Sequence, residues 1–267
     1  MSNGRFSRQS FLGDKSQDII ESTLVGLTGL GGGGSHIVQQ LAHVGFLNYR
    51  IYDPDVVEDS NLNRLVGANN KDAAEGSPKI EVAKRIIKGL CPHASIESYA
   101  QRWQDNPEPL RGCDMIFGCV DSFIERRELE ACARRYLIPL IDIGMDIHVV
   151  GDEPPRMGGQ VILSMPDSPC MFCLGFLNEV TLAREGERYG DAGARPQVIW
   201  PNGVLASTAV GIAIDLLTDW TRSLRGVVYL EYDGNMGILM PHVRLQYLGE
   251  RKCPHYPLGQ VGDPVLL

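Results

Sequence analysis

Short apolar runs and amphipathic segments alternate along the first half of the chain. Five short runs predict buried strands, at residues 24–27, 48–52, 95–99, 115–120 and 137–143. Three segments with apolar residues at helical spacing predict helices, at residues 35–44, 79–90 and 122–136. Ser122 and Glu125 have the spacing of a capping box at the start of the third helix. This alternation predicts a parallel sheet with helices on both faces.

The pattern changes after Gly158. We expect a strand at residues 160–165, a helix at 202–217, and a β-pair at 227–232 and 242–247. The polar, charged segment Glu179–Gln197 predicts a mobile loop over a site. The expected fold class is α/β: a Rossmann-like, doubly wound, mostly parallel sheet with a β-rich C-terminal extension, in a single domain that covers residues 1–267.

A glycine-rich turn, Gly29-Leu-Gly31-Gly32-Gly33-Gly34-Ser35, lies between the first predicted strand and the first predicted helix. A strand, a turn too tight for a Cβ atom and a helix N-terminus together present backbone N–H groups to a phosphate. Asp53 ends the second predicted strand about 20 residues later, where an acidic side chain meets ribose hydroxyls in this architecture. We therefore expect a nucleotide site, although a glycine-rich turn alone can be purely structural.

Composition and charge exclude several classes of function. The chain of 267 residues is 43% hydrophobic, so it can bury a core, and its net charge of −8 argues against a general nucleic-acid or membrane-surface binder. The longest apolar stretch, Val204–Leu217, is too short to span a bilayer, and residues 1–8 lack the apolar core of a signal peptide. Seven cysteines, an odd number, suit a reducing compartment, so we expect a cytoplasmic protein.

Five motifs follow one another along the chain: Arg5-Phe-Ser-Arg8-Gln9, the glycine-rich turn, Asp53-Pro-Asp55 with Ser60-Asn61-Leu-Asn-Arg64, Gly76-Ser-Pro-Lys79, and Val120-Asp121-Ser122. Together they resemble the motifs of the ubiquitin-activating-enzyme superfamily in its compact ThiF/MoeB form. The resemblance covers nearly the whole chain, and the ordered set is far more specific than the glycine-rich turn by itself.

The resemblance implies a homodimeric adenylyltransferase. Such an enzyme uses ATP and Mg²⁺ to adenylate the C-terminal carboxylate of a small β-grasp protein, ubiquitin-like or sulfur-carrying and often ending in Gly-Gly, or of a peptide. It also implies that residues 1–150 form a nucleotide-binding half. Residues 151–267 would form a second half, associated with the carrier protein and with the dimer. The family's arginine that matches Arg8 reaches into the nucleotide site of the partner subunit.

The chemistry of adenylation favours the same residues. The carboxylate and the α-phosphate are both anions, so fixed cations and proximity carry most of the work. Arg64 and Lys79 are the cations that we place on the triphosphate, and Asn61 can donate an amide N–H to it. Asp121 follows a central strand, where a carboxylate is well placed to hold Mg²⁺. The predicted catalytic residues are Arg8, Arg64, Lys79 and Asp121. The predicted nucleotide-binding residues are Gly29, Gly31, Gly32, Gly33, Gly34, Asp53, Asp55, Asn61, Arg64, Lys79 and Asp121.

Each of these residues also has a simpler interpretation. Arg64 can be a solvated charge, Lys79 the start of a helix, Asp121 an N-cap and Asp55 a turn residue. The glycine-rich turn also suits an NAD-dependent oxidoreductase, although a dinucleotide site does not need Arg64 and Lys79. A third hypothesis is a catalytically silent binding module for a ubiquitin-like partner.

The cysteines suggest a metal site rather than a nucleophile. Cys170-Met-Phe-Cys173 has the spacing of half a tetrahedral zinc site. The family's structural zinc uses a second such pair, which here reads Cys253-Pro-His255-Tyr256. Tyrosine is a poor zinc ligand and histidine a good one, so the candidate zinc ligands are Cys170, Cys173, Cys253 and His255, with plain buried thiols as the alternative.

Relatives that form thioesters carry a cysteine between these two pairs, and this chain has none there. Cys113, Cys119 and Cys132 lie in apolar patterns and predict buried thiols. We therefore expect adenylation without an internal catalytic cysteine.

Overall fold

An eight-stranded mixed sheet is the centre of the structure, a computed structural model that describes residues 4–149, 151–187, 196–218, 220–221, 227–249, 253–257 and 261–262. The strands are β1 (Leu24–Thr28), β2 (Asn48–Tyr52), β3 (Ser95–Tyr99), β4 (Met115–Gly118), β5 (Leu140–His148), β6 (Arg156–Ser164), β7 (Val228–Asp233) and β8 (Ile238–Pro241). They follow the spatial order β3-β2-β1-β4-β5-β6-β7-β8. The first five are parallel and the last three antiparallel. The expected α/β fold with its β-rich C-terminal extension is confirmed.

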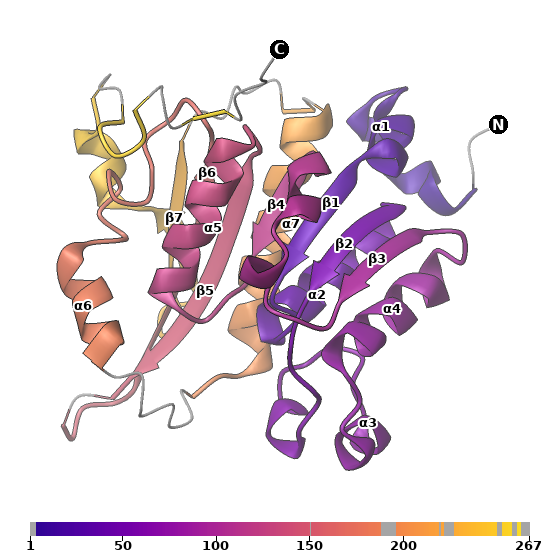
Figure 1. The fold of residues 1–267 in the computed structure, drawn as a ribbon, viewed down its shortest axis with the longest axis horizontal. Helices are drawn as coiled ribbons and strands as arrows, with labels where there is room; N and C mark the ends of the chain where they lie inside the picture. Colours follow the sequence, from indigo (N-terminus) through magenta and orange to yellow (C-terminus); the bar gives the residue numbers. More distant parts are fainter. Residues whose placement is uncertain are drawn as a thin grey trace.

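Helices cover both faces of this sheet (Figure 1). They are α1 (Ser16–Ser22), α2 (Gly32–Val44), α3 (Asn70–Glu75), α4 (Lys79–Leu90), α5 (Phe123–Arg135), α6 (Glu179–Glu187) and α7 (Ile199–Thr218). Successive strand residues point to opposite faces. Phe117 therefore packs in the core layer with α1, α2, α4 and α7, and its neighbour Ile116 packs in the layer with α5. Short 3₁₀ helices connect the elements: η1 (Gly4–Leu12), η2 (Asp59–Asn61), η3 (Trp103–Asp105), η4 (Glu108–Gly112) and η5 (Val243–Tyr247).

Two expectations for the second half were wrong. The charged segment expected to be a loop contains α6. Asn178 directly precedes this helix, and its side chain accepts a hydrogen bond from the Thr181 N–H (3.0 Å) and so caps the first turn. Residues 188–195 of that segment lie outside the described residues. The partner of β7 is β8, not residues 242–247. Val243–Tyr247 form η5, and the His242 side chain caps it by accepting a hydrogen bond from the Arg244 N–H (3.1 Å).

Several element boundaries differ from those expected. β5 begins at Leu140 rather than at Leu137, because Leu137 has a left-handed φ of 59° and turns the chain after α5. β6 begins at Arg156, and α2 begins inside the glycine-rich turn, at Gly32. α7 has 20 residues and so has the length and composition of a membrane-spanning helix, longer than the apolar stretch suggested. It is a core helix here, since its apolar side chains pack with those of α2 and the sheet.

Candidate functional site

A cavity of about 400 Å³ opens where β1, β2 and β4 end. The carboxyl ends of parallel strands are the usual place for a ligand in an open α/β sheet. The structure brings together here most of the predicted residues, namely Gly29, Gly31, Gly32, Gly33, Asp53, Asp55, Asn61, Arg64, Lys79 and Asp121. Within the described part of the chain, Gly34 and Arg8 are not among the lining residues.

The glycines of the turn have different roles. A Cβ atom at Gly34 would lie 2.0 Å from the carbonyl oxygen of Gly29, so this position needs glycine for the turn itself. Gly29 has a φ of +84°, and a Cβ there would lie 2.5 Å from the Cys119 carbonyl oxygen. Gly31 has open space around its Cβ position and lines the cavity. Gly34 thus shapes the turn, and Gly31 faces the ligand space.

This difference predicts that one alanine substitution lowers stability and the other weakens ATP binding. Gly34→Ala should destabilise the protein by about 2–4 kcal/mol, because the new methyl group overlaps fixed backbone. Gly31→Ala should keep the unfolding midpoint of the parent and weaken ATP binding, because its methyl group enters the cavity. Urea unfolding and titration calorimetry with ATP measure the two effects. Equal midpoints for the two variants would contradict this assignment.

Asp53 lies at the end of β2 and is buried. Its two carboxylate oxygens accept hydrogen bonds from the Leu30 N–H (2.6 Å) and the Asp55 N–H (2.8 Å). Burial raises the pKa of this carboxyl, and Lys79 and the two N–H donors oppose that rise. Asp53 therefore ties the glycine-rich turn to the end of β2.

Two of the cationic residues that line the cavity, Arg64 and Lys79, were predicted from the sequence. The Lys79 ammonium contacts the Asp55 carboxylate at 2.7 Å, and the Lys79 side chain is 12% exposed. Arg64 donates from one terminal nitrogen to the Ser60 carbonyl oxygen (2.6 Å) and to Asn63 Oδ1 (2.9 Å). Both residues line the same cavity as the glycine-rich turn.

Asn61 and Asp121 complete the predicted set. Asn61 is buried, and its Oδ1 accepts from the Glu58 N–H (3.2 Å). Asp121 is exposed to the cavity just after β4. It is not the N-cap of α5, because Ser122 takes that role and accepts from the Glu125 N–H (3.2 Å). The capping box is only half formed, since the Glu125 carboxylate instead accepts from Gln104 Nε2 (3.1 Å).

Sequence reasoning missed several residues that line the cavity: Tyr52, Gln101, Arg102, Trp103, Cys119, Glu125, Arg126, Gln197 and Asn202. Asn202 could have been predicted from the sequence, because it is a polar residue at the start of an apolar helix. Its side chain packs against the glycine-rich turn, where a Cβ at Gly32 would lie 2.6 Å from Asn202 Nδ2.

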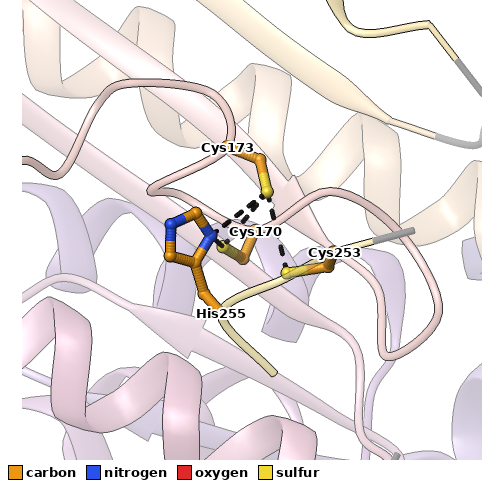
Figure 2. A group of neighbouring side chains, drawn as sticks. All are labelled: Cys170, Cys173, Cys253 and His255. Carbon is orange, nitrogen blue, oxygen red and sulfur yellow. Dashed lines mark hydrogen bonds between the residues drawn. The ribbon is translucent and has the colours of Figure 1, made fainter. Parts of the chain in front are cut away.

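The four candidate metal ligands, two from the loop after β6 and two from the C-terminal segment, converge on one another (Figure 2). Cys173 Sγ lies 3.7 Å from both Cys170 Sγ and Cys253 Sγ, and His255 Nδ1 lies 3.4 Å from Cys170 Sγ and Cys173 Sγ. A tetrahedral zinc ion with usual bond lengths requires S–S separations of about 3.8 Å and S–N separations of about 3.5 Å. The cluster is therefore consistent with zinc, with His255 rather than Tyr256 as the fourth donor.

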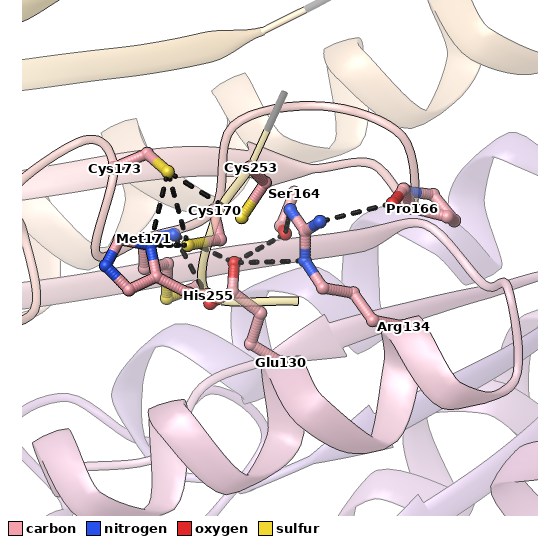
Figure 3. A network of polar contacts seen from close by, with 9 residues as sticks. All are labelled: Glu130, Arg134, Ser164, Pro166, Cys170, Met171, Cys173, Cys253 and His255. Carbon is pink, nitrogen blue, oxygen red and sulfur yellow. Dashed lines mark hydrogen bonds and ion pairs between the residues drawn. The ribbon is translucent and has the colours of Figure 1, made fainter. Parts of the chain in front are cut away.

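A buried polar network lies behind this cluster (Figure 3). Glu130 and Arg134 of α5 are an i, i+4 pair with side chains 0% and 1% exposed. Glu130 accepts from the Met171 N–H (2.9 Å) and from Ser164 Oγ (2.6 Å), and Arg134 donates to the Pro166 carbonyl oxygen (3.2 Å). The Arg134 guanidinium also lies over the Tyr256 ring, 5.0 Å from its centre. The network thus holds the loop of Cys170 and Cys173 on α5.

Comparisons with known proteins define the class. The model of the ThiF family matches residues 6–254, so the chain belongs to the ThiF family and is classed with the adenylyltransferases of the E1/ThiF type. The molybdopterin-synthase adenylyltransferase of Salmonella typhimurium is 29% identical over 239 residues, which are 86% of this chain and 87% of that protein.

Two further proteins are similar. The SAMP-activating enzyme E1 of Haloferax volcanii is 33% identical over 175 residues, or 64% of this chain, and the match spans 61% of that enzyme's length. The crystal structure of E. coli MccB with MccA-N7isoASN superposes with a TM-score of 0.74 at 20% identity, covering 91% of this chain and 72% of MccB. At this sequence identity, the similarity shows a shared fold alone.

Proposed function

We propose that this protein uses ATP to adenylate the C-terminal carboxylate of a small ubiquitin-like or sulfur-carrier protein, or of a peptide. The observation that carries the proposal is the single cavity in which the glycine-rich turn, Arg64, Lys79 and Asp121 meet. Relatives named for molybdopterin synthase and for SAMP support a protein substrate. A binding module without chemistry would not require this set of charges.

The reaction joins two anions. A carboxylate oxygen of the substrate attacks the α-phosphorus of ATP, the bond from that phosphorus to the bridging oxygen breaks, and pyrophosphate leaves with the electron pair. Arg64 and Lys79 would neutralise the phosphates, with Lys79 exchanging its contact with Asp55 for one with the nucleotide. Asp121 fits Mg²⁺ because it is a carboxylate exposed in the cavity, and the ion would add charge neutralisation at the phosphates.

No cysteine of this chain is proposed as a nucleophile. Cys119 is the cysteine that lines the cavity among the described residues, and burial raises the pKa of its thiol. Burial likewise raises the pKa of Cys113 to about 12 and that of Cys132 to about 11. Thiolate formation is therefore unfavourable at these positions, and the acyl-adenylate would pass to an acceptor supplied by a partner.

We also propose that the protein acts in the cytoplasm as a homodimer. Arg8 is exposed on η1 and does not line the cavity of its own subunit. The nearby Phe11 and Trp220 rings pack edge to face at 5.5 Å, and they are 66% and 47% exposed. A second subunit that covers this apolar pair would let Arg8 reach the neighbouring nucleotide.

Pyrophosphate exchange tests the proposed function. With Mg²⁺, radiolabelled pyrophosphate and a small protein ending in Gly-Gly, label should enter ATP, and mass spectrometry should detect the acyl-AMP. The same small protein with an amidated C-terminus is the matched control, because it lacks the attacking carboxylate. Tight binding of NADH with no exchange for any Gly-terminated candidate would favour the oxidoreductase instead.

A further inference from the structure

A buried ion pair lies beside the nucleotide cavity and was not predicted from the sequence. Arg126 of α5 pairs with Asp142 of β5, and their side chains are 7% and 0% exposed. Burial raises the pKa of Asp142 to about 6, and the Arg126 guanidinium opposes that rise. Burying an arginine costs folding free energy unless its charge is paired and its N–H donors are hydrogen-bonded. The contacts of Arg126 therefore indicate its role.

The Arg126 guanidinium contacts three groups: the Asp142 carboxylate and the carbonyl oxygens of Ile143 and Val120. One terminal nitrogen contacts Asp142 and donates to the Ile143 carbonyl oxygen (3.0 Å), and the other donates to the Val120 carbonyl oxygen (2.5 Å). Val120 directly precedes Asp121. The guanidinium therefore fixes the peptide that carries the proposed magnesium ligand against β5.

The surrounding backbone leaves room for this pair. A Cβ atom at Gly144 would lie 2.5 Å from an Arg126 terminal nitrogen, and one at Gly118 would lie 2.9 Å from Asp142 Oδ2. Glycines on two adjacent strands thus accommodate the two charged groups. Phe176, three residues after Cys173, covers the guanidinium with its ring centre at 5.9 Å.

The other side of Asp121 is also held in place. Ser122 caps α5, and Glu185 of α6 accepts hydrogen bonds from Ser122 Oγ (3.2 Å) and from the Ile124 N–H (3.0 Å). Asp121 consequently lies between two fixed points, the Val120 carbonyl and the Ser122 cap. A carboxylate fixed in this way loses little conformational entropy when it binds a metal ion.

We propose that Arg126 is a positioning residue, which sets the affinity for magnesium–ATP by holding the backbone that carries Asp121. The inference rests on the proposed role of Asp121 as the magnesium ligand. Lysine cannot replace arginine here, because its donors sit on one atom and cannot reach the Val120 carbonyl and the β5 groups from two directions.

Calorimetric titration separates this role from a direct contact with the nucleotide. ATP is titrated into the protein with EDTA and then with excess Mg²⁺. For Arg126→Lys, we expect magnesium–ATP affinity to fall at least about tenfold, while affinity for metal-free ATP stays within about twofold of wild type. Arg127→Lys is the matched control, since the neighbouring Arg127 side chain is 43% exposed and contacts Glu128. It should bind both forms like wild type.

Each outcome decides the inference. A folded Arg126→Lys variant that loses affinity equally for both forms of ATP, or for neither, overturns it while the proposed function stands. If Arg126→Lys does not fold, Asp142→Asn decides, because it removes the charge that pairs with the guanidinium and keeps the size of the side chain. A selective loss of magnesium–ATP affinity in that variant supports the inference, and unchanged affinity overturns it. Wild-type protein with no magnesium dependence overturns the role of Asp121 as well.

Discussion

Replacing Asp121 with alanine is expected to slow formation of the acyl-adenylate by about 10²–10³-fold, the usual cost of removing one preorganised electrostatic group. Asp121 is exposed in the cavity, and Ser122 rather than Asp121 caps the following helix, so the substitution leaves the observed cap of α5 intact. The loss should therefore appear in pyrophosphate exchange and not in the thermal unfolding midpoint.

Asp105→Ala is the matched control for this prediction. Asp105 is an exposed aspartate of η3 and does not line the cavity, so the variant should exchange pyrophosphate at the parental rate. Raising the Mg²⁺ concentration should recover part of the activity of Asp121→Ala if the carboxylate acts through the metal. Full exchange by Asp121→Ala at ordinary Mg²⁺ concentration would remove this residue from the mechanism.

The parallel half of the fold could be predicted because its signals are local. β2, β3 and α4 have the bounds that the apolar spacing indicated, since each is a regular run ended by a turn, a polar residue or Cys91-Pro92. The antiparallel half of the sheet was harder to predict from the sequence. Val243, Leu245 and Tyr247 alternate as in a strand, but they form η5, because a short edge segment is decided by its contacts and its cap.

The candidate site shows the same division. Residues that closely follow the strands, such as Asp53 and Asp121, could be placed from the sequence because the carboxyl ends of parallel strands meet at one edge. Arg126 could not, because its partner Asp142 is 16 positions away and the pair forms only when α5 packs on β5. A charged residue in an amphipathic helix is ordinarily read as solvent-exposed.

The second large effect is expected at the cysteine cluster. Cys170→Ser should lower the zinc content of the purified protein from about one ion per chain to a small fraction, since zinc prefers thiolate and imidazole donors. A structural zinc ion contributes to folding free energy directly, so the midpoint of thermal unfolding should fall by roughly 10 °C. Metal analysis by mass spectrometry and a thermal scan measure the two quantities.

The surrounding contacts explain why a single ligand should matter so much. The cluster joins the Cys170–Cys173 loop to the segment of Cys253 and His255, and the His255 ring stacks on Phe172 at 5.2 Å. Without the metal, only weak thiol hydrogen bonds would join the three sulfur atoms and the imidazole. Cys132→Ser is the control, because this half-buried thiol lies outside the cluster and should leave zinc content unchanged. Wild-type protein that is free of zinc and unfolds at the same temperature as Cys170→Ser would show that these residues are plain thiols.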